Sequence, residues 1–257
     1  MPVRQIHKRL RRLFFSVIAL VILLAGGYFF RKWWEYQQLR STRYPEFGIT
    51  IPDRYSIHGI DVSRYQERIA WEEVKAMKVK DIQLGFSFIK ATEGIGNTDP
   101  YFSRNWQKAK ENELTRGAYH FFIASRDGKM QAENFINKVK LERGDLPPVL
   151  DIEQMNGTSA MELKKEAKKW LEAVEYYYQV KPIIYTNVDF YERNLGREFD
   201  AYPLWAAHYD QEGEPRIRRS WAFWQHSDEG RVNGIASRVD FNVFNGDSLE
   251  FKNFLLR

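Results

Sequence analysis

The feature that most restricts the fold of this chain is an alternation of short β-rich runs with amphipathic segments, which starts near Tyr55. The candidate strands are rich in β-branched and aromatic residues and span 58–63, 84–91, 117–123, 148–152, 183–186, 204–207, 222–226 and 239–243. Apolar residues recur at the helical spacings of three and four in 71–78, 99–113, 129–140 and 159–178. Strands that alternate with helices predict parallel pairing.

Eight candidate strands favour one α/β barrel, because such barrels use roughly 200–250 residues as a single domain. A doubly wound open sheet is the alternative, but no Gly-rich phosphate-binding loop follows the first strand. The later connections are short of helix, especially between Tyr209 and Trp221. We therefore predict an irregular, TIM-like β/α barrel over residues 55–257, with few helices in its last third.

A different kind of segment precedes the barrel. Residues 13–30 are 18 uncharged and mainly apolar residues, close to the roughly 20 that cross a hydrocarbon core. Five basic residues precede this run at positions 4, 8, 9, 11 and 12, whereas two follow it directly, before Trp33 and Trp34. This asymmetry predicts a cytoplasmic amino terminus, and the tryptophans are typical of the opposite interface.

These patterns predict four regions: a cytoplasmic basic tail (1–12), a transmembrane anchor (13–30), a juxtamembrane stalk (31–54) and the barrel domain (55–257). The barrel would then lie outside the cytoplasm, in the cell envelope. A cleaved signal peptide is an alternative, although the apolar run exceeds the roughly 7–15 residues that are usual for one. A buried helix of a soluble protein is a third interpretation.

The distribution of charge argues against nucleic acid as a partner. The formal net charge is +5, but residues 1–43 hold nine Lys or Arg and a single acid, Glu35. The remaining residues therefore carry a small excess of acids, whereas a nucleic-acid binder needs its positive charge on the folded domain.

The chain has no cysteine, which excludes disulfides, thiol nucleophiles and Cys-based zinc sites. We expect a monomer.

Four acids lie within or directly after the apolar runs: Asp61, Asp151, Glu153 and Asp240. In a parallel barrel the carboxyl ends of the strands form the active-site face. Asp151 and Glu153 are two residues apart, so in an extended strand their side chains share a face, with Cα atoms roughly 6.5–7 Å apart. Crowded carboxylates raise the pKa of at least one of them, and glycoside hydrolases use such an acid to protonate the leaving group.

Each acid taken alone could instead cap a helix or pair with a basic residue, but four at matching strand ends favour a site. A divalent metal site is another interpretation, since oxygen ligands suit Mg²⁺ and Ca²⁺. The histidines of the domain show no H-x-x-x-H spacing. We expect neither a metal nor a cofactor.

Several motifs occur together in one order: GIDVS at 59–63, FIKATEG at 88–94, DPYF at 99–102, GAYHF at 117–121, LDIE at 150–153 and VDFN at 239–242. With them, the chain resembles the glycoside hydrolase family 25 lysozymes, which are N-acetylmuramidases with an irregular β/α barrel, over about residues 57–246. The resemblance implies that Glu153 is the proton donor, assisted by Asp151, and that Asp61 and Asp240 complete an acidic cleft. The implied reaction is hydrolysis of the β-1,4 bond between N-acetylmuramic acid and N-acetylglucosamine in peptidoglycan.

The resemblance also implies a set of residues that line the sugar-binding groove: Tyr119, Tyr185, Trp205, Gln225, Glu93 and Asn242. The aromatic members could equally be core residues. The sequence departs from the family pattern at Glu67, where glycine is common, at Ala70, where aspartate is common, and at His226, where an aromatic residue is usual. These departures bear on the shape of the groove, because the four acids are all present.

Two mechanisms fit the acid pair. In one, a carboxylate attacks the anomeric carbon, which requires two carboxyl groups roughly 5–5.5 Å apart. In the other, the substrate's own N-acetyl group attacks and Asp151 orients it. The D-x-E spacing favours the second mechanism, since both side chains then flank the same side of the sugar.

Two other functions remain open from the sequence: a chitinase-like hydrolase of another N-acetylated glycan, and a cell-wall-binding barrel without catalysis. Chitinase-like enzymes usually have a longer run of acids before the D-x-E pair, and residues 146–150 hold none. Retention of all four acids argues against an inactive barrel.

Overall fold

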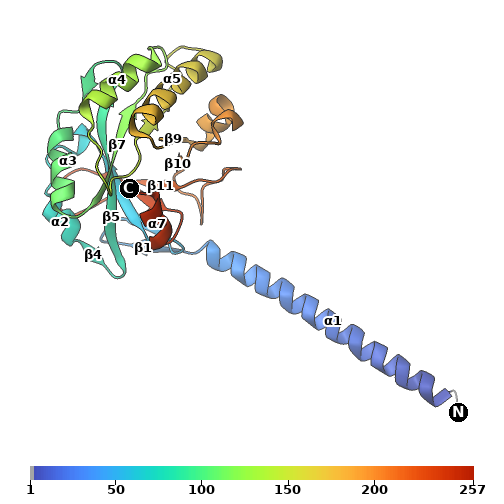
Figure 1. Cartoon of the computed structure of the whole chain (residues 1–257). Helices are drawn as coiled ribbons and strands as arrows, with labels where there is room; N and C mark the ends of the chain where they lie inside the picture. Colours follow the sequence, from blue (N-terminus) through green and yellow to red (C-terminus); the bar gives the residue numbers. More distant parts are fainter. Residues whose placement is uncertain (1–2) are drawn as a thin grey trace. The chain divides into compact units, whose positions relative to one another are not determined.

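The computed structural model describes residues 3–257 of the chain (Figure 1). The chain divides into two compact units, one ending at Arg40 and the other spanning Ser41–Arg257. The predicted basic tail, 1–12, lies partly outside the described residues, because residues 1 and 2 are not described.

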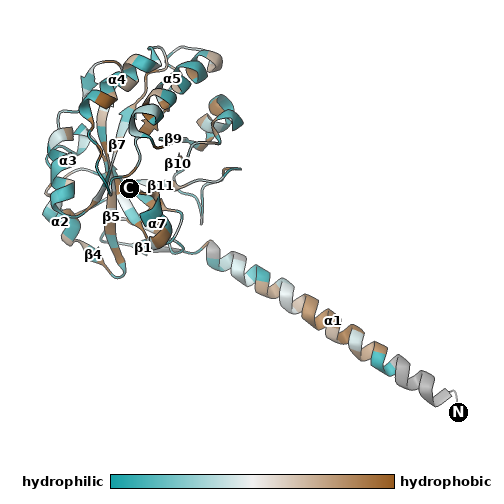
Figure 2. Cartoon of the chain, viewed as in Figure 1, coloured by the Kyte–Doolittle hydropathy of each residue, from teal (hydrophilic) through white to brown (hydrophobic). Residues whose placement is uncertain are grey.

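The first unit is one long helix, α1 (Val3–Gln38). Its stretch Arg11–Trp34 is long and apolar enough to cross a membrane, and none of that stretch is buried. Figure 2 shows hydrophobic residues along the middle of the helix. The helix extends beyond the predicted span of 13–30 and includes the first part of the predicted stalk.

The second unit starts with a hairpin that the sequence analysis assigned to the stalk. Strands β1 (Ser41–Tyr44) and β2 (Ile49–Pro52) pair antiparallel. The side chains of Tyr44, Phe47, Ile49 and Ile51 are buried in the main core, where the ring of Phe47 lies 5.2 Å from that of Phe241. The start of the domain therefore moves from residue 55 to Ser41, because burial of these apolar side chains makes the hairpin part of the barrel domain.

The eight predicted strands are present and form the predicted closed barrel. Their order is β3–β12–β11–β10–β9–β8–β7–β5, and β5 pairs back with β3. Their bounds are β3 (His58–Val62), β5 (Ile82–Glu93), β7 (Thr115–Phe121), β8 (Val149–Asp151), β9 (Ile183–Asn187), β10 (Leu204–Ala207), β11 (Phe223–Gly230) and β12 (Val239–Phe244). Two short strands, β4 (Lys78–Val79) and β6 (Asn97–Thr98), also pair with β5.

The prediction of parallel pairing is wrong for one strand. Strand β12 runs antiparallel to both of its neighbours, β11 and β3. The connection from β11 to β12, residues 231–238, contains no helix, and a link this short cannot return the chain to the far end of the sheet as a parallel crossover does. As a result Asp240, near the start of β12, lies at the same end of the barrel as the carboxyl ends of the other strands.

The predicted helices are present as α2 (Trp71–Ala76), α3 (Phe102–Glu111), α4 (Gly128–Lys138) and α5 (Ala160–Tyr178), which pack along the outside of the strands (Figure 1). The last third has only short helical elements before the carboxyl terminus, as predicted. They are α6 (Val188–Phe190), the π-helical turn η2 (Tyr191–Leu195), the 3₁₀ turn η3 (Arg197–Phe199) and the final helix α7 (Ser248–Phe254).

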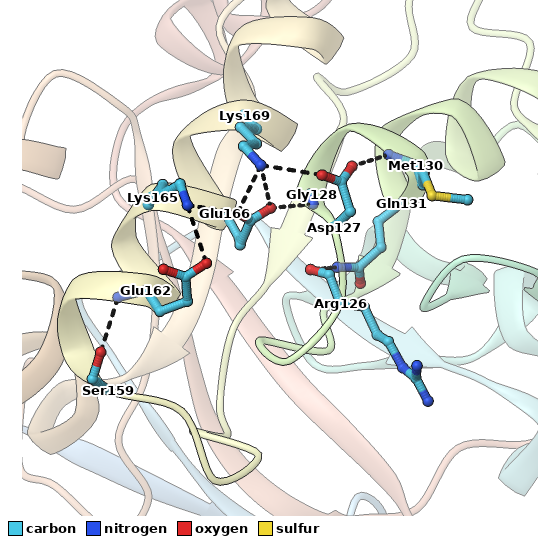
Figure 3. Close-up of polar contacts among 10 residues, drawn as sticks. All are labelled: Arg126, Asp127, Gly128, Met130, Gln131, Ser159, Glu162, Lys165, Glu166 and Lys169. Atoms are coloured by element: carbon cyan, nitrogen blue, oxygen red, sulfur yellow. Dashed lines mark hydrogen bonds and ion pairs between the residues drawn. The ribbon is translucent and has the colours of Figure 1, made fainter.

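Helices α4 and α5 are joined by polar contacts, of which the one from Gly128 to Glu166 is buried (Figure 3). The carboxylate of Glu166 accepts a hydrogen bond from the backbone N–H of Gly128 at 2.7 Å, and Lys169 pairs with both Glu166 and Asp127 at 2.7 and 3.1 Å. A Cβ atom on Gly128 would lie 1.9 Å from the carbonyl oxygen of Glu166. Only glycine therefore allows this close approach of α4 to α5.

Aromatic rings fill the interior of the barrel below its open end. Phe86 and Phe88 pack edge-on against Phe223 with ring centroids 5.3 and 5.1 Å apart. The motif glycines Gly59 and Gly117 make room for them, because a Cβ atom at either position would lie 2.5 Å from one of these rings. The GIDVS and GAYHF motifs thus also serve packing.

Candidate active site

The four predicted acids meet at one end of the barrel. Asp61 of β3 and Asp240 of β12 are directly paired in register, Asp151 ends β8, and Glu153 follows it by two residues. All four line one pocket of about 250 Å³. Its other lining residues are Val62, Ser63, Tyr65, Gln66, Lys90, Tyr119, Phe121, Tyr185, Trp205, Tyr209 and Gln225.

Asp151 and Glu153 form a coupled acid pair in the pocket, because each carboxyl affects the pKa of the other. Ile152 between them is fully buried on the opposite side, so the alternation expected of an extended strand brings both carboxyls into the pocket. Burial raises the pKa of both carboxyls, and the charge of Glu153 raises the pKa of Asp151 further. The pair therefore holds a proton more readily than two exposed carboxyls would.

One oxygen of this pair has no partner. Oδ1 of Asp151 is buried and accepts no hydrogen bond from any described residue. A buried carboxylate oxygen is costly unless it is satisfied, so this atom is suited to accept a hydrogen bond from a bound molecule.

Asp61 is held by two side-chain amides. Its Oδ2 atom accepts hydrogen bonds from Nε2 of Gln225 at 2.8 Å and from Nδ2 of Asn242 at 2.7 Å. Burial raises the pKa of Asp61 to about 6. Burial and the neighbouring charge of Asp61 raise the pKa of Asp240 to about 9, so these two carboxyls share a proton near neutral pH.

Hydrogen bonds from aromatic side chains hold those amides in place. The hydroxyls of Tyr185 and Tyr209 both donate to Oε1 of Gln225 at 2.7 Å. The indole N–H of Trp205 donates to Oδ1 of Asn242, also at 2.7 Å. Because each amide oxygen is held by an aromatic donor, each amide nitrogen is turned toward Asp61.

The predicted groove residues have different positions in the structure. Tyr119 and Tyr185 line the pocket. Trp205 touches the pocket but is only 2% exposed and stacks on Phe88 at 4.2 Å. Asn242 is fully buried and does not line the pocket, so it acts through Asp61 rather than on a ligand.

Glu93 also lies outside this pocket. It pairs with Lys90 at 2.7 Å and lines a neighbouring depression of about 400 Å³. Lys90 belongs to both hollows, and its charge lowers the pKa of Asp151 and of Glu153 against the effect of burial.

Lys90, Tyr65 and Tyr209 are among the pocket residues that were not predicted from the sequence. Lys90 lies within the FIKATEG motif, which was a usable signal. Tyr209 follows β10 closely, where barrel strands present their side chains to the open end. Nothing local to Tyr65 distinguishes it from an ordinary exposed tyrosine.

Two departures from the family pattern have local backbone consequences. Glu67 has φ of +50° and ψ of −129°, a conformation that favours glycine. Ala70 is the N-cap of α2 and supplies no side-chain hydrogen bond to the helix, whereas an aspartate would. His226, the third departure, is buried against Trp224 and Phe241 and does not reach the pocket.

The pocket continues into two depressions on different sides of the barrel mouth. One, reached past Lys90, lies over β3 and β5; the other shares Glu153 and Tyr209 with the pocket and lies over β8 to β10, with a volume of about 330 Å³. The three hollows therefore adjoin one another on both sides of the acid pair. Within the described part of the chain, no group of three or more potential metal ligands is suited to a metal ion.

A sequence profile identifies the family of this barrel. The profile of "Glycosyl hydrolases family 25" matches residues 60–235, which include three of the four acids, Asp61, Asp151 and Glu153. The chain belongs to glycosyl hydrolase family 25. It is therefore a glycoside hydrolase.

The chain is also similar to individual proteins along most of its length. The chain is 51% identical over 209 residues to the uncharacterized protein YegX of Escherichia coli K12, covering 81% of this chain and 77% of YegX. It is 32% identical to Lysozyme M1 of Streptomyces globisporus, covering 76% and 70% of the two chains. The structure of a family 25 glycosyl hydrolase from Bacillus anthracis superimposes with a TM-score of 0.74 at 33% identity, covering 83% of this chain and 99% of that one.

Proposed function

We propose that this family 25 enzyme is a lysozyme that hydrolyses the β-1,4 bond from N-acetylmuramic acid to N-acetylglucosamine in peptidoglycan. The observation that carries the proposal is the position of Asp151 and Glu153 side by side in one pocket of a family 25 barrel, where burial raises the pKa of both carboxyls. Similarity to Lysozyme M1 supports peptidoglycan as the substrate.

In the proposed reaction Glu153 protonates the glycosidic oxygen as the bond to the anomeric carbon breaks. Glu153 is suited to this role because it stays partly accessible from the pocket and belongs to a buried pair that holds a proton. Glu153 is then a carboxylate. In the second step it takes a proton from the attacking water, which restores the starting state.

Asp151 has a separate role in this proposal. Its unpartnered Oδ1 atom accepts a hydrogen bond from the N–H of the substrate's 2-acetamido group. The acetamido carbonyl oxygen, turned toward the anomeric carbon, forms a cyclic intermediate as the leaving group departs, and water later opens that ring. Asp61, with Gln225, Asn242 and the shared proton of Asp240, forms the opposite wall of the cleft.

The test uses Glu153→Gln and Asp151→Asn in the full-length protein with purified peptidoglycan. We expect each variant to lose roughly 10²–10⁴-fold in turnover, with binding to the insoluble wall retained. Glu172→Gln, an exposed carboxyl of α5 that does not line the pocket, is the matched control. Turnover near that of wild type in Glu153→Gln would contradict its role as the proton donor.

Mass spectrometry of the fragments identifies the bond that is cut. We expect N-acetylmuramic acid at the new reducing ends. Equal cleavage of chitin oligomers would favour the chitinase-like alternative, and an absence of any fragments would favour a wall-binding barrel.

We further propose that α1 anchors the enzyme in the membrane, with the barrel on the extracytoplasmic side, and that the enzyme acts as a monomer. Three observations support the anchor: the apolar stretch Arg11–Trp34, the basic residues before it, and the exposed Trp33 and Trp34 near its far end. Peptidoglycan also lies outside the cytoplasm.

A further inference from the structure

The depression beside Lys90 is the strongest feature that the reaction does not use. It has a volume of about 400 Å³, shares Lys90 with the catalytic pocket, and is lined by Arg64, Lys90, Glu93, Gly96, Asn97, Thr98, Asp99 and Pro100. Its lining contains two acids and two bases. Their contacts decide which charge is free to bind a ligand.

Both acids of this depression are already occupied. The two carboxylate oxygens of Asp99 accept hydrogen bonds from the backbone N–H groups of Arg64 and Tyr101 at 2.8 and 2.9 Å. The carboxylate of Glu93 pairs with the ammonium group of Lys90 at 2.7 Å.

The guanidinium group of Arg64 is in a different state. It forms no ion pair with a carboxylate among the described residues, lies 5.3 Å from the centre of the exposed Tyr65 ring, and is open to solvent. The available charge in this depression is therefore positive, and it belongs to a group that binds carboxylates through two parallel hydrogen bonds.

The depression of about 330 Å³ on the other side of the acid pair offers no positively charged side chain among its described lining residues. Its lining contains Asp189 and His208 but neither lysine nor arginine among the residues that the structure describes. Burial lowers the pKa of His208, so this imidazole is neutral near neutral pH. The two arms of the cleft therefore differ in the charge that they offer a substrate.

Peptidoglycan carries negative charge at a defined place. Each N-acetylmuramic acid bears, through its lactyl group, a peptide stem that contains free carboxylates, whereas the glycan itself is uncharged. We propose, on the basis of the function proposed above, that the depression beside Lys90 is a subsite for this stem and that Arg64 pairs with one of its carboxylates. The enzyme then prefers glycan with acidic stems, and the stem side of the substrate lies over β3 and β5.

The test measures kcat and KM of the detergent-solubilised full-length protein on two soluble muropeptide oligomers. In one the stem carboxylates are free, and in the other they are amidated. We expect wild type to show a KM roughly fivefold lower for the free-carboxylate substrate with similar kcat, and this preference should disappear in high salt because the pair is exposed.

Arg64→Gln should remove the preference by raising KM for the free-carboxylate substrate alone, and Arg64→Lys should keep part of it. The backbone N–H of residue 64 still holds Asp99 in both variants. Arg68 is exposed and lines neither the catalytic pocket nor the two depressions beside it. The control Arg68→Gln should therefore behave as wild type.

If Arg64→Gln raised KM equally for both substrates, or left KM unchanged, the proposal of a stem subsite would be wrong. It would also be wrong if the wild-type enzyme cut both substrates with the same KM. Failure of the proposed function gives a different result, because wild type would then cleave neither substrate.

Discussion

At the scale of single residues, Lys90 connects the acid pair to the rest of the cleft. Its ammonium group pairs with Glu93 at 2.7 Å and lies 4.6 Å from the ring centre of Phe121. Burial raises the pKa of Asp151 and of Glu153, and the charge of Lys90 opposes that rise. Lys90 therefore helps to set the pH range in which the pair holds one proton.

Replacement of this charge gives a pH prediction. In Lys90→Met the pKa values of both acids rise, because the opposing charge is gone while burial remains. The reaction requires that the pair holds one proton, so both the alkaline and the acidic limbs of kcat/KM against pH should move to higher pH. Lys90→Arg keeps the charge and should keep the profile. A lower kcat with unmoved limbs in Lys90→Met would show that Lys90 acts only on packing.

At the scale of elements, β12 and the β1–β2 hairpin are the parts that complete the domain. The antiparallel β12 places Asp240 beside Asp61 and, through Asn242, supplies one of the two amide donors to Asp61. The hairpin covers the outer side of this region, where Phe47 packs on Phe241 of the same strand. The strand that carries half of the acidic wall is thus supported by residues that precede the predicted domain.

The hairpin can be tested through stability. Phe47→Ala should lower the free energy of unfolding of the barrel by roughly 3–5 kcal/mol, the usual cost of deleting a fully buried phenylalanine. Urea unfolding of the detergent-solubilised full-length protein, followed by tryptophan fluorescence, measures it. Thr50→Ala, an exposed position of the same hairpin, should change stability by less than about 0.5 kcal/mol. If Phe47→Ala and Thr50→Ala had the same free energy of unfolding, the hairpin would be a stalk, as predicted from the sequence.

At the scale of the whole molecule, a hydrolase domain follows a helix able to cross a membrane. An anchored enzyme reaches only glycan close to its own membrane, so the proposed arrangement confines cleavage to nearby wall. Such confinement suits local remodelling of the wall.

The topology can be tested with thiol labelling, because the chain contains no cysteine. Gln5→Cys and Ser41→Cys lie before and after the apolar stretch. In intact cells whose outer barrier is permeable to the reagent, a membrane-impermeant maleimide should label Ser41→Cys directly, and Gln5→Cys only after the inner membrane is opened. Recovery of a shortened, soluble protein that has lost the Gln5→Cys label would establish a cleaved signal peptide instead.

The sequence by itself determined the set of eight strands, the scarcity of helices in the last third, and the meeting of Asp61, Asp151 and Glu153 at one face. These follow from local information. The spacing at which hydrophobic residues recur identifies strands and helices. The carboxyl ends of parallel strands meet at one face whatever lies between them. The pair Asp151–Glu153 was the most local feature of all, since two residues of spacing decide that both face the cleft.

Only the tertiary structure decided the direction of β12, the place of the hairpin, and the division of the groove residues into those that line the pocket and those that hold Asp61. Gln225 and Asn242 bond to Asp61 across 164 and 181 residues of sequence. Such contacts exist only once the barrel closes and brings β3 beside β12, and no pattern within a strand specifies which distant side chain will fill its hydrogen bonds. The same holds for Lys90 and Arg64, because their roles depend on which nearby carboxylates are already occupied.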